Sequence, residues 1–199
     1  YYLFLLLALG ATMGIFLSGD LYTTFIFFEM MSFASYVWVV QEETPEAVSA
    51  SRSYLTIGVL GGLVTLMGVF LLYHLVGTLQ LDALRDACAA VENRRLLYAA
   101  GGCILFGFAA KAGMFPLHFW MPRSYTAAPA PATAILSAVL SKAGIFGVLI
   151  VSCDMFYRDA DWGMLILMLG VVTMLLGAVL GLFSVNLKRT LACSSMSQI

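Results

Sequence analysis

The chain has 199 residues, of which 62% are hydrophobic and 11% are charged, and its formal net charge is −1. Soluble domains carry about 25% charged residues, so this composition excludes a soluble domain and indicates an integral membrane protein. The nearly balanced charge favours no polyanionic partner, and we expect the chain to contact the lipid bilayer and not nucleic acid.

Apolar runs recur along the whole chain, and about 20 helical residues are enough to cross some 30 Å of hydrocarbon. We predict six spans, at residues 1–18, 21–40, 53–73, 96–119, 131–151 and 163–183, with the start of a seventh near Lys188. All should be helices, because a helix satisfies its own backbone hydrogen bonds in lipid and no strand-like alternation is present. The predicted fold class is an all-α polytopic transmembrane helical bundle. The chain opens inside a span and stops without a cap, so we expect a fragment of a longer protein.

The segments between the predicted spans contain few candidate functional residues. Residues 81–92 suit either a short helix in the membrane interface or an ordinary loop with one helical turn.

The four cysteines are far apart, and we interpret them as small core residues rather than metal ligands. Signatures for haem, iron–sulfur clusters, dinucleotides and nucleotide phosphates are absent, so we expect no cofactor and no redox centre in this chain. Lys and Arg divide four to four between the two sets of loops, which gives no orientation.

Three ionisable residues fall within the predicted spans: Glu29, Lys111 and Lys142. Each charge costs about 2.5–3.5 kcal/mol at the centre of a membrane helix on insertion scales, so each indicates a functional site that needs a partner. A static buried ion pair between Glu29 and one lysine is the structural alternative. One carboxylate cannot neutralise two ammonium groups, which favours lysines that exchange protons.

The helix around Lys111 is predicted to break between Lys111 and Pro116. Pro116 cannot donate to the carbonyl of Ala112, and Gly113 lowers the cost of a bend. A broken helix is tolerated in a membrane where it lines a hydrated cavity or is packed in protein, and such a cavity would let Lys111 change its protonation state. His118 is either a proton relay toward the helix of Lys142 or an interfacial residue that donates to a freed carbonyl.

Three segments carry a resemblance to a known family: "SGDLYTTFIFFEMMSFASYVWV", "FGFAAKAGMFPLHFWMPRSYTAAPAPATAILSAVLSKAGIFG" and "NLKRTLACSSMSQI". The chain resembles the antiporter-like membrane subunits of respiratory complex I (NADH:quinone oxidoreductase), Mrp sodium/proton antiporters and membrane-bound hydrogenases of the formate hydrogenlyase type. The resemblance implies a single proton-translocating domain over residues 1–199, with a first five-helix repeat at about 1–151 and the start of a second at about 163–199.

The resemblance also implies roles: Glu29 as the acid that couples to a neighbouring channel, Lys111 as the central lysine and Lys142 as the next station. His118 falls on the Pro-Leu-His that follows the broken helix in the family. The chain departs from common family patterns at four positions: Gly113, Arg123, Tyr125 and Asn186. These departures leave the central charges intact and put the route of proton or ion uptake from the loop side in question.

The function expected from the resemblance is proton translocation, alone or in exchange for sodium, within a redox-driven complex of several membrane subunits. The alternatives are a stand-alone or Mrp-type cation/proton antiporter subunit and a structural membrane scaffold. The resemblance places the protein in the inner (plasma) membrane of a prokaryote.

Overall fold

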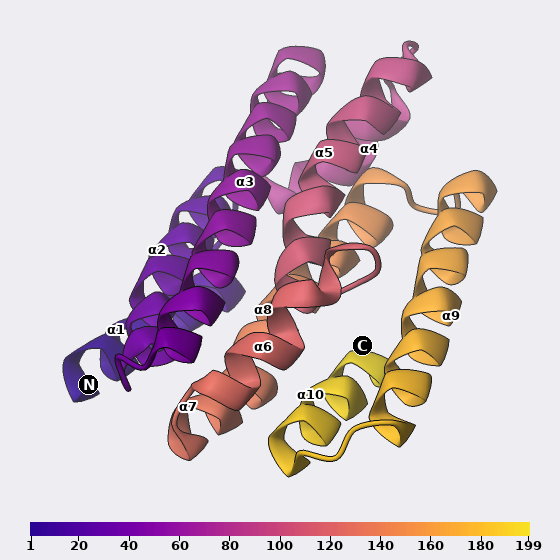
Figure 1. Cartoon of the computed structure of the whole chain (residues 1–199). Coiled ribbons are helices and arrows are strands. Elements are labelled where there is room, and N and C mark those ends of the chain that lie inside the picture. Colours follow the sequence, from indigo (N-terminus) through magenta and orange to yellow (C-terminus); the bar gives the residue numbers. More distant parts are fainter.

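The structure is a computed structural model that describes all residues, 1–199, and it contains helices, turns and one isolated β-bridge, between Asp20 and Gln80. The α-helices are α1 (Tyr2–Leu17), α2 (Leu21–Val40), α3 (Pro45–Val76), α4 (Leu81–Ala89), α5 (Arg94–Ala112), α6 (Trp120–Ala127), α7 (Ala130–Ile135), α8 (Ser141–Ile150), α9 (Ala160–Leu182) and α10 (Leu187–Ser197). Three short segments of other helix types accompany them: η1 (Leu117–Phe119), η2 (Leu136–Leu140) and η3 (Val151–Met155). In Figure 1, α1 to α3 lie on one side, α5 and α8 in the middle, and α9 with α10 on the opposite side.

The predicted fold class is confirmed. Five helical segments are long and apolar enough to cross a membrane, namely 21–40, 45–76, 94–127, 130–155 and 160–182, and α1 is a shorter apolar helix of 16 residues. The segment 94–127 contains the predicted break near Lys111. The chain is therefore a multi-pass membrane protein.

The predicted start of the third span at residue 53 is wrong. Helix α3 begins at Pro45, because Thr44 caps it by accepting a hydrogen bond from the backbone N–H of Ala47, 3.1 Å away. Proline suits the first turn, where its missing N–H is not needed. At 1.5 Å per residue a 32-residue helix is roughly 48 Å long, so α3 exceeds the hydrocarbon thickness and places Arg52 in a helix rather than in a loop.

The segment after α3 forms the short helix α4, which was one of the two alternatives for residues 81–92. Leu84 and Cys88 are buried, whereas Asp82 and Asp86 are exposed. Burial raises the pKa of Cys88 to about 11, which keeps the thiol protonated. Cys88 and Cys193 are core residues as expected, but Cys103 is half-buried and Cys153 is exposed, so the expectation is wrong for Cys153.

The segment of residues 130–155 carries Lys142 and is not a uniform α-helix. Lys142 is the second residue of α8. The π-helical segments η2 and η3 lie directly before and directly after α8, so the helix is wound more widely at both of its ends. Short π-helical segments occur frequently at functional sites. Hydropathy does not encode them, and neither segment was predicted.

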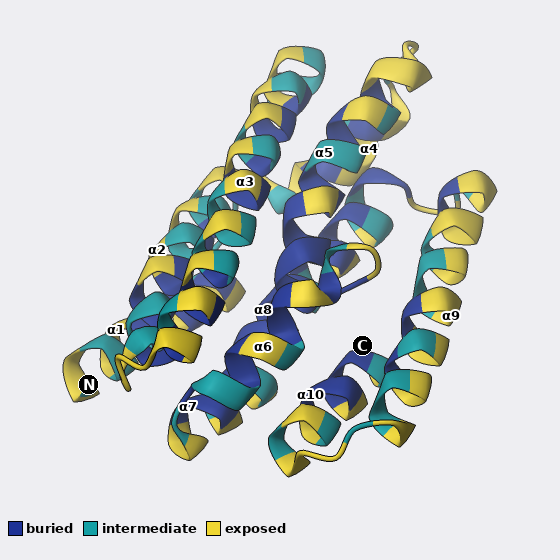
Figure 2. Cartoon of the chain, in the orientation of Figure 1, coloured by how far each residue is buried: buried dark blue, intermediate teal, exposed yellow.

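Helices α3 and α5 approach closely through small residues. A Cβ atom on Gly107 of α5 would lie 1.8 Å from Thr65 Oγ1 and 2.5 Å from the carbonyl oxygen of Gly61, so no larger residue fits between the two helices. Figure 2 shows the result: α5 is largely buried along the half that ends near α6, whereas α9 is mostly exposed or half-buried. The best-packed part of the bundle thus surrounds the end of α5.

Candidate functional site

Helix α5 ends just after Lys111, and Gly113 causes the termination. Gly113 adopts a left-handed conformation (φ 82°, ψ 29°), and its N–H donates to the carbonyls of Ala109 and Ala110. The N–H of Met114 also donates to Ala109, over 2.9 Å, which completes a Schellman-type ending. The break therefore comes three residues before Pro116, at the glycine.

Two side chains from outside α5 hold the broken segment. Trp120 of α6 donates its indole N–H to the carbonyl of Ala110 over 2.7 Å, and Thr173 of α9 accepts a hydrogen bond from the N–H of Phe115 over 3.0 Å. Polar backbone groups exposed by a helix break must find such partners in a membrane. The break is thus packed in protein, on α6 from one side and on α9 from the other.

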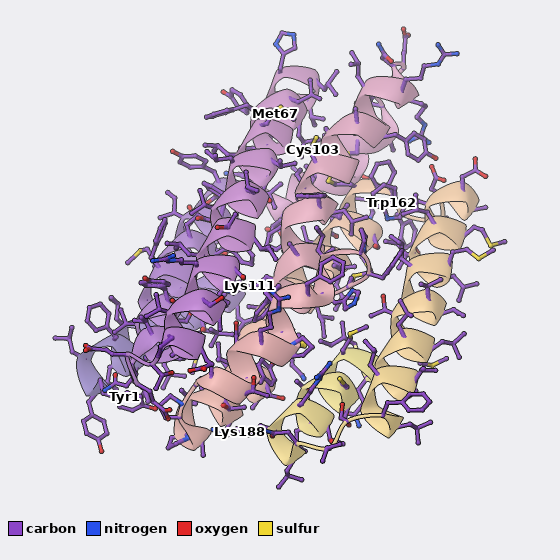
Figure 3. All side chains as sticks on the ribbon, in the orientation of Figure 1. Tyr1, Met67, Cys103, Lys111, Trp162 and Lys188 are labelled. Carbon is purple, nitrogen blue, oxygen red and sulfur yellow. The ribbon has the colours of Figure 1, made fainter.

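Lys111 lies inside the bundle with 5% of its surface exposed. Its Nζ atom donates to the hydroxyl oxygen of Tyr54 on α3 and lies 4.3 Å from the centroid of the same ring. The Tyr54 hydroxyl also shares a hydrogen bond with the hydroxyl of Ser35 on α2. Figure 3 shows Lys111 at the end of α5, beside the loop that leads to α6.

Glu29 of α2 reaches the same region from the opposite side. Its carboxylate packs against Gly62 of α3, where an added Cβ atom would lie 2.3 Å from Oε1. Oε1 is buried and has no hydrogen-bond partner. The ion pair in the structure joins Arg85 and Asp154, 3.6 Å apart at the far end of the bundle. Glu29 and Lys111 are therefore not in contact as a static pair.

Two small cavities adjoin between Glu29 and Lys111. Each has a volume of about 10 Å³, which is room for about one water molecule. Lys111 lines the first cavity and Glu29 lines the second. Three residues line both: Ser32, Tyr54 and Gly58. The acid and the amine therefore face two water-sized spaces that share a polar wall.

Lys142 lies elsewhere. It is exposed, and its Nζ atom donates to the carbonyl of Ser137 in η2 over 3.1 Å. The Ser137 hydroxyl is 2.7 Å from the hydroxyl of Ser195 on α10. Lys142 lines neither of the two cavities, so the structure brings Glu29 and Lys111 together and leaves Lys142 on a separate face near α10.

An aromatic side chain stands between these two regions. Trp120 makes edge-to-face contacts with Tyr54, at 5.0 Å between ring centroids, and with Tyr125, at 6.4 Å. Tyr125 is fully buried, and its hydroxyl is 3.2 Å from the hydroxyl of Ser141. Because the only N–H of the Trp120 ring is bound to Ala110, the indole offers no hydrogen bond to connect Tyr54 with Tyr125.

His118 is 8% exposed, and its Nδ1 atom has no hydrogen-bond partner. Trp120, and not His118, donates to the carbonyl of Ala110 at the break. His118 lines a wide groove of about 680 Å³. Arg123, Asn186 and Arg189 line the same groove at the loop side.

Comparison with known proteins decides the family. Residues 18–199 match the family described as NADH:quinone oxidoreductase/Mrp antiporter, transmembrane. The chain belongs to this family. The resemblance seen in the sequence is thereby confirmed.

Relatives in this family come from several kinds of membrane complex. The chain is 34% identical over 200 residues to a Na(+)/H(+) antiporter subunit of Alkalihalophilus pseudofirmus, covering 100% of this chain and 41% of that protein. It is 30% identical to "Hydrogenase-4 component B" of Escherichia coli (96% and 30% covered). It is 31% identical to an NADH-quinone oxidoreductase subunit of Desulfitobacterium hafniense (100% and 40% covered).

Solved structures of the family share the fold. A chain of the Mrp complex from Dietzia sp. superimposes with a TM-score of 0.90 at 27% identity, over 98% of this chain and 37% of that one. The chain thus spans about 40% or less of the length of these family members.

Within this family fold, Tyr54 is the site residue that sequence reasoning missed. A tyrosine near the end of a predicted span is normally an interfacial anchor, and only the early start of α3 places Tyr54 deep in the bundle. Ser32 and Ser35 follow Glu29 by one and nearly two helical turns on α2, and that spacing was the available signal for a polar wall beside the acid.

Proposed function

We propose that this chain conducts protons across a membrane as part of a subunit of a larger, redox-driven membrane complex. One observation carries the proposal: the buried Lys111 and the half-buried Glu29 are not paired with each other and face adjoining water-sized cavities. A scaffold would gain nothing from an acid and an amine kept apart, because an unpaired buried charge destabilises a membrane protein.

In the proposed mechanism Lys111 is the central proton carrier. It accepts a proton when its environment favours the ammonium form and releases the proton when that environment changes. Glu29 sets that environment, since a carboxylate favours the charged lysine when it is ionised and no longer does so when it is protonated. Lys142 is the next station along the route, and His118 serves as a relay at the loop side.

The names of the relatives support assembly with other membrane subunits and location in a prokaryotic inner membrane, and both are part of this proposal. No redox chemistry is assigned to the chain itself. The family members named as sodium/proton antiporter subunits favour a second candidate, in which the protons are exchanged for sodium. The sodium dependence of proton flux in vesicles decides between the two.

The test uses the full-length protein assembled in membrane vesicles. We expect Lys111→Met and Glu29→Gln each to lower proton transport by about 100-fold, as is typical for loss of a general acid or base, with normal assembly. Arg95→Gln, which removes an exposed charge at the start of α5, serves as the control and should leave transport unchanged. Wild-type transport in both Lys111→Met and Glu29→Gln would refute the proposal and leave the scaffold.

A further inference from the structure

Tyr54 occupies the point where the two halves of the site meet. It is 4% exposed, and its hydroxyl oxygen accepts a hydrogen bond from Lys111 Nζ. The same hydroxyl shares a hydrogen bond with Ser35 on α2, the helix that carries Glu29. A single oxygen atom thus links α5 with α2 through α3.

Tyr54 borders both water-sized cavities. Tyr54 lines the cavity of Lys111 and the cavity of Glu29, together with Ser32 and Gly58. Gly58 presents no side chain where the cavities share their wall, and a Cβ atom there would meet no atom within 4 Å. The wall that the two cavities share is therefore formed by Tyr54, Ser32 and Gly58. The Ser32 hydroxyl donates to the carbonyl of Phe28 in its own helix, so Tyr54 is the member of this wall that is bonded to Lys111.

Packing alone does not account for a tyrosine at this position. The edge-to-face contact with Trp120 and the contact with the Lys111 ammonium involve the ring, and phenylalanine would retain both. The hydroxyl is what tyrosine adds. In a membrane interior a hydroxyl with two polar partners and adjoining water sites is suited to pass a proton, because it donates and accepts at once.

We propose that the hydroxyl of Tyr54 is the relay group through which protons pass between Lys111 and Glu29. The inference rests on the proposed function and names the path within that site. The two ionisable groups make no direct contact, so a transfer between them needs an intermediate, and Tyr54 is the group that touches Lys111 and borders the cavity of Glu29.

The transfer conserves protons at every group. An N–H bond of the Lys111 ammonium breaks as the Tyr54 oxygen takes that proton. The original O–H of Tyr54, which donates to Ser35 in the structure, turns to a water molecule in the Glu29 cavity, and its bond breaks as the proton passes to that water. That water gives up a proton to the Glu29 carboxylate. Lys111 ends as a neutral amine, Glu29 as a carboxylic acid, and Tyr54 and the water are unchanged.

The first experiment is Tyr54→Phe in the full-length protein assembled in vesicles. We expect proton transport to fall at least tenfold with normal assembly, and the double variant Tyr54→Phe/Glu29→Gln to be no slower than Glu29→Gln alone, because both changes interrupt one path. Tyr98→Phe is the matched control. It removes the hydroxyl of a tyrosine that bonds Asp159 at the far end of the bundle, and it should transport protons at the wild-type rate.

A second experiment separates a relay from a purely structural tyrosine. Replacing Tyr54 by 3,5-difluorotyrosine keeps the ring and the hydroxyl but makes the hydroxyl more acidic, so a relay moves the pH profile of transport to lower pH. A wild-type rate in Tyr54→Phe, or an unchanged pH profile with the fluorinated residue, overturns the inference. If Lys111→Met also transports at the wild-type rate, the proposed function fails as well, whereas loss of transport in Lys111→Met alone leaves that function standing.

Discussion

Lys111 and Lys142 are the same residue type in apolar helices, yet their surroundings differ sharply. Lys111 is 5% exposed and enclosed by α2, α3 and α6, with a tyrosine hydroxyl as its partner. Lys142 is exposed and donates to a backbone carbonyl of its own helix segment. The flanking helices, and not the lysine or its apolar neighbours, decide which amine this chain encloses.

The two cavities beside Glu29 and Lys111 are built from a small part of the chain. The residues that enclose an acid and an amine all lie between Phe28 and Trp120, on α2, α3, α5 and α6. An ammonium group in a membrane helix needs hydrogen-bond partners or an opposite charge. This chain supplies one partner for Lys142, the backbone carbonyl of Ser137. The same substitution at Lys111 and at Lys142 should therefore give different results.

The largest difference is expected from replacing each lysine by methionine. Lys111→Met removes a buried charge that has no ion-pair partner, so we expect the free energy of unfolding to rise by about 1–4 kcal/mol even though transport is lost. Lys142→Met should change it by less, since the ammonium group of Lys142 is exposed in this part of the protein and already donates to a carbonyl. Unfolding of the full-length protein in mixed detergent micelles measures both. Equal effects at the two positions would contradict the different burial of the two lysines.

The next largest effect concerns the packing that encloses Lys111. Gly107→Ala places a Cβ atom against Thr65 and the backbone of Gly61, so α3 and α5 must separate. We expect a loss of about 1–3 kcal/mol in the free energy of unfolding, as for other overpacked cores. Gly102→Ala on the same helix meets no atom within 4 Å and is the matched control. A Gly107→Ala protein as stable as the control would show that the two helices are not in close contact.

A smaller effect is expected at the residue between the two regions. Trp120→Phe keeps an aromatic ring but removes the N–H that donates to Ala110, so we expect a loss of about 1 kcal/mol, the usual contribution of one hydrogen bond. Hydrogen exchange of the amides at 110–114 should become faster in this variant. Unchanged exchange would mean that the broken segment does not depend on Trp120.

The smallest effect concerns a link at the far end of the bundle, where Tyr98 of α5 donates to Asp159 before α9 over 2.6 Å. This hydrogen bond, and those from the N–H groups of Trp162 and Asp161, hold the pKa of Asp159 below its usual value. A carboxyl with a lowered pKa contributes stability above its unfolded pKa, and that contribution is lost as pH falls through the folded pKa. Acid should therefore destabilise the wild type slightly more than Tyr98→Phe, as measured by thermal unfolding between about pH 5 and pH 3. Identical acid sensitivity would argue against this bond.

Much of this organisation was visible in the sequence, and the remainder has physical causes. Apolar length predicted the spans, and the presence of Gly113 near Pro116 predicted the break, because both depend on local composition. The start of α3 was missed because the cap at Thr44 extends a helix through polar residues that look like a loop. The position of the break at Gly113 also depends on local backbone hydrogen bonds that hydropathy does not report.

The site was predictable in its ionisable residues but not in its connections. Buried charges stand out in an apolar chain, so Glu29 and Lys111 could be named at once. Tyr54 could not, because a tyrosine is common in membrane helices and its importance comes from tertiary contacts with α2 and α5. The difference between Lys111 and Lys142 also escaped the sequence, since it depends on which helices cover each face.

The bond between Thr173 and the N–H of Phe115 couples two parts of the chain that otherwise touch little. Helix α9 is largely exposed and packs mainly on α10. The Thr173 hydroxyl of α9 nevertheless accepts a hydrogen bond from the N–H of Phe115, four residues after Lys111. A sideways shift of α9 by about an ångström would strain or break that hydrogen bond and release the loop that follows Lys111. A movement of the exposed helix α9 would thus be transmitted through this hydrogen bond to the loop beside the buried Lys111.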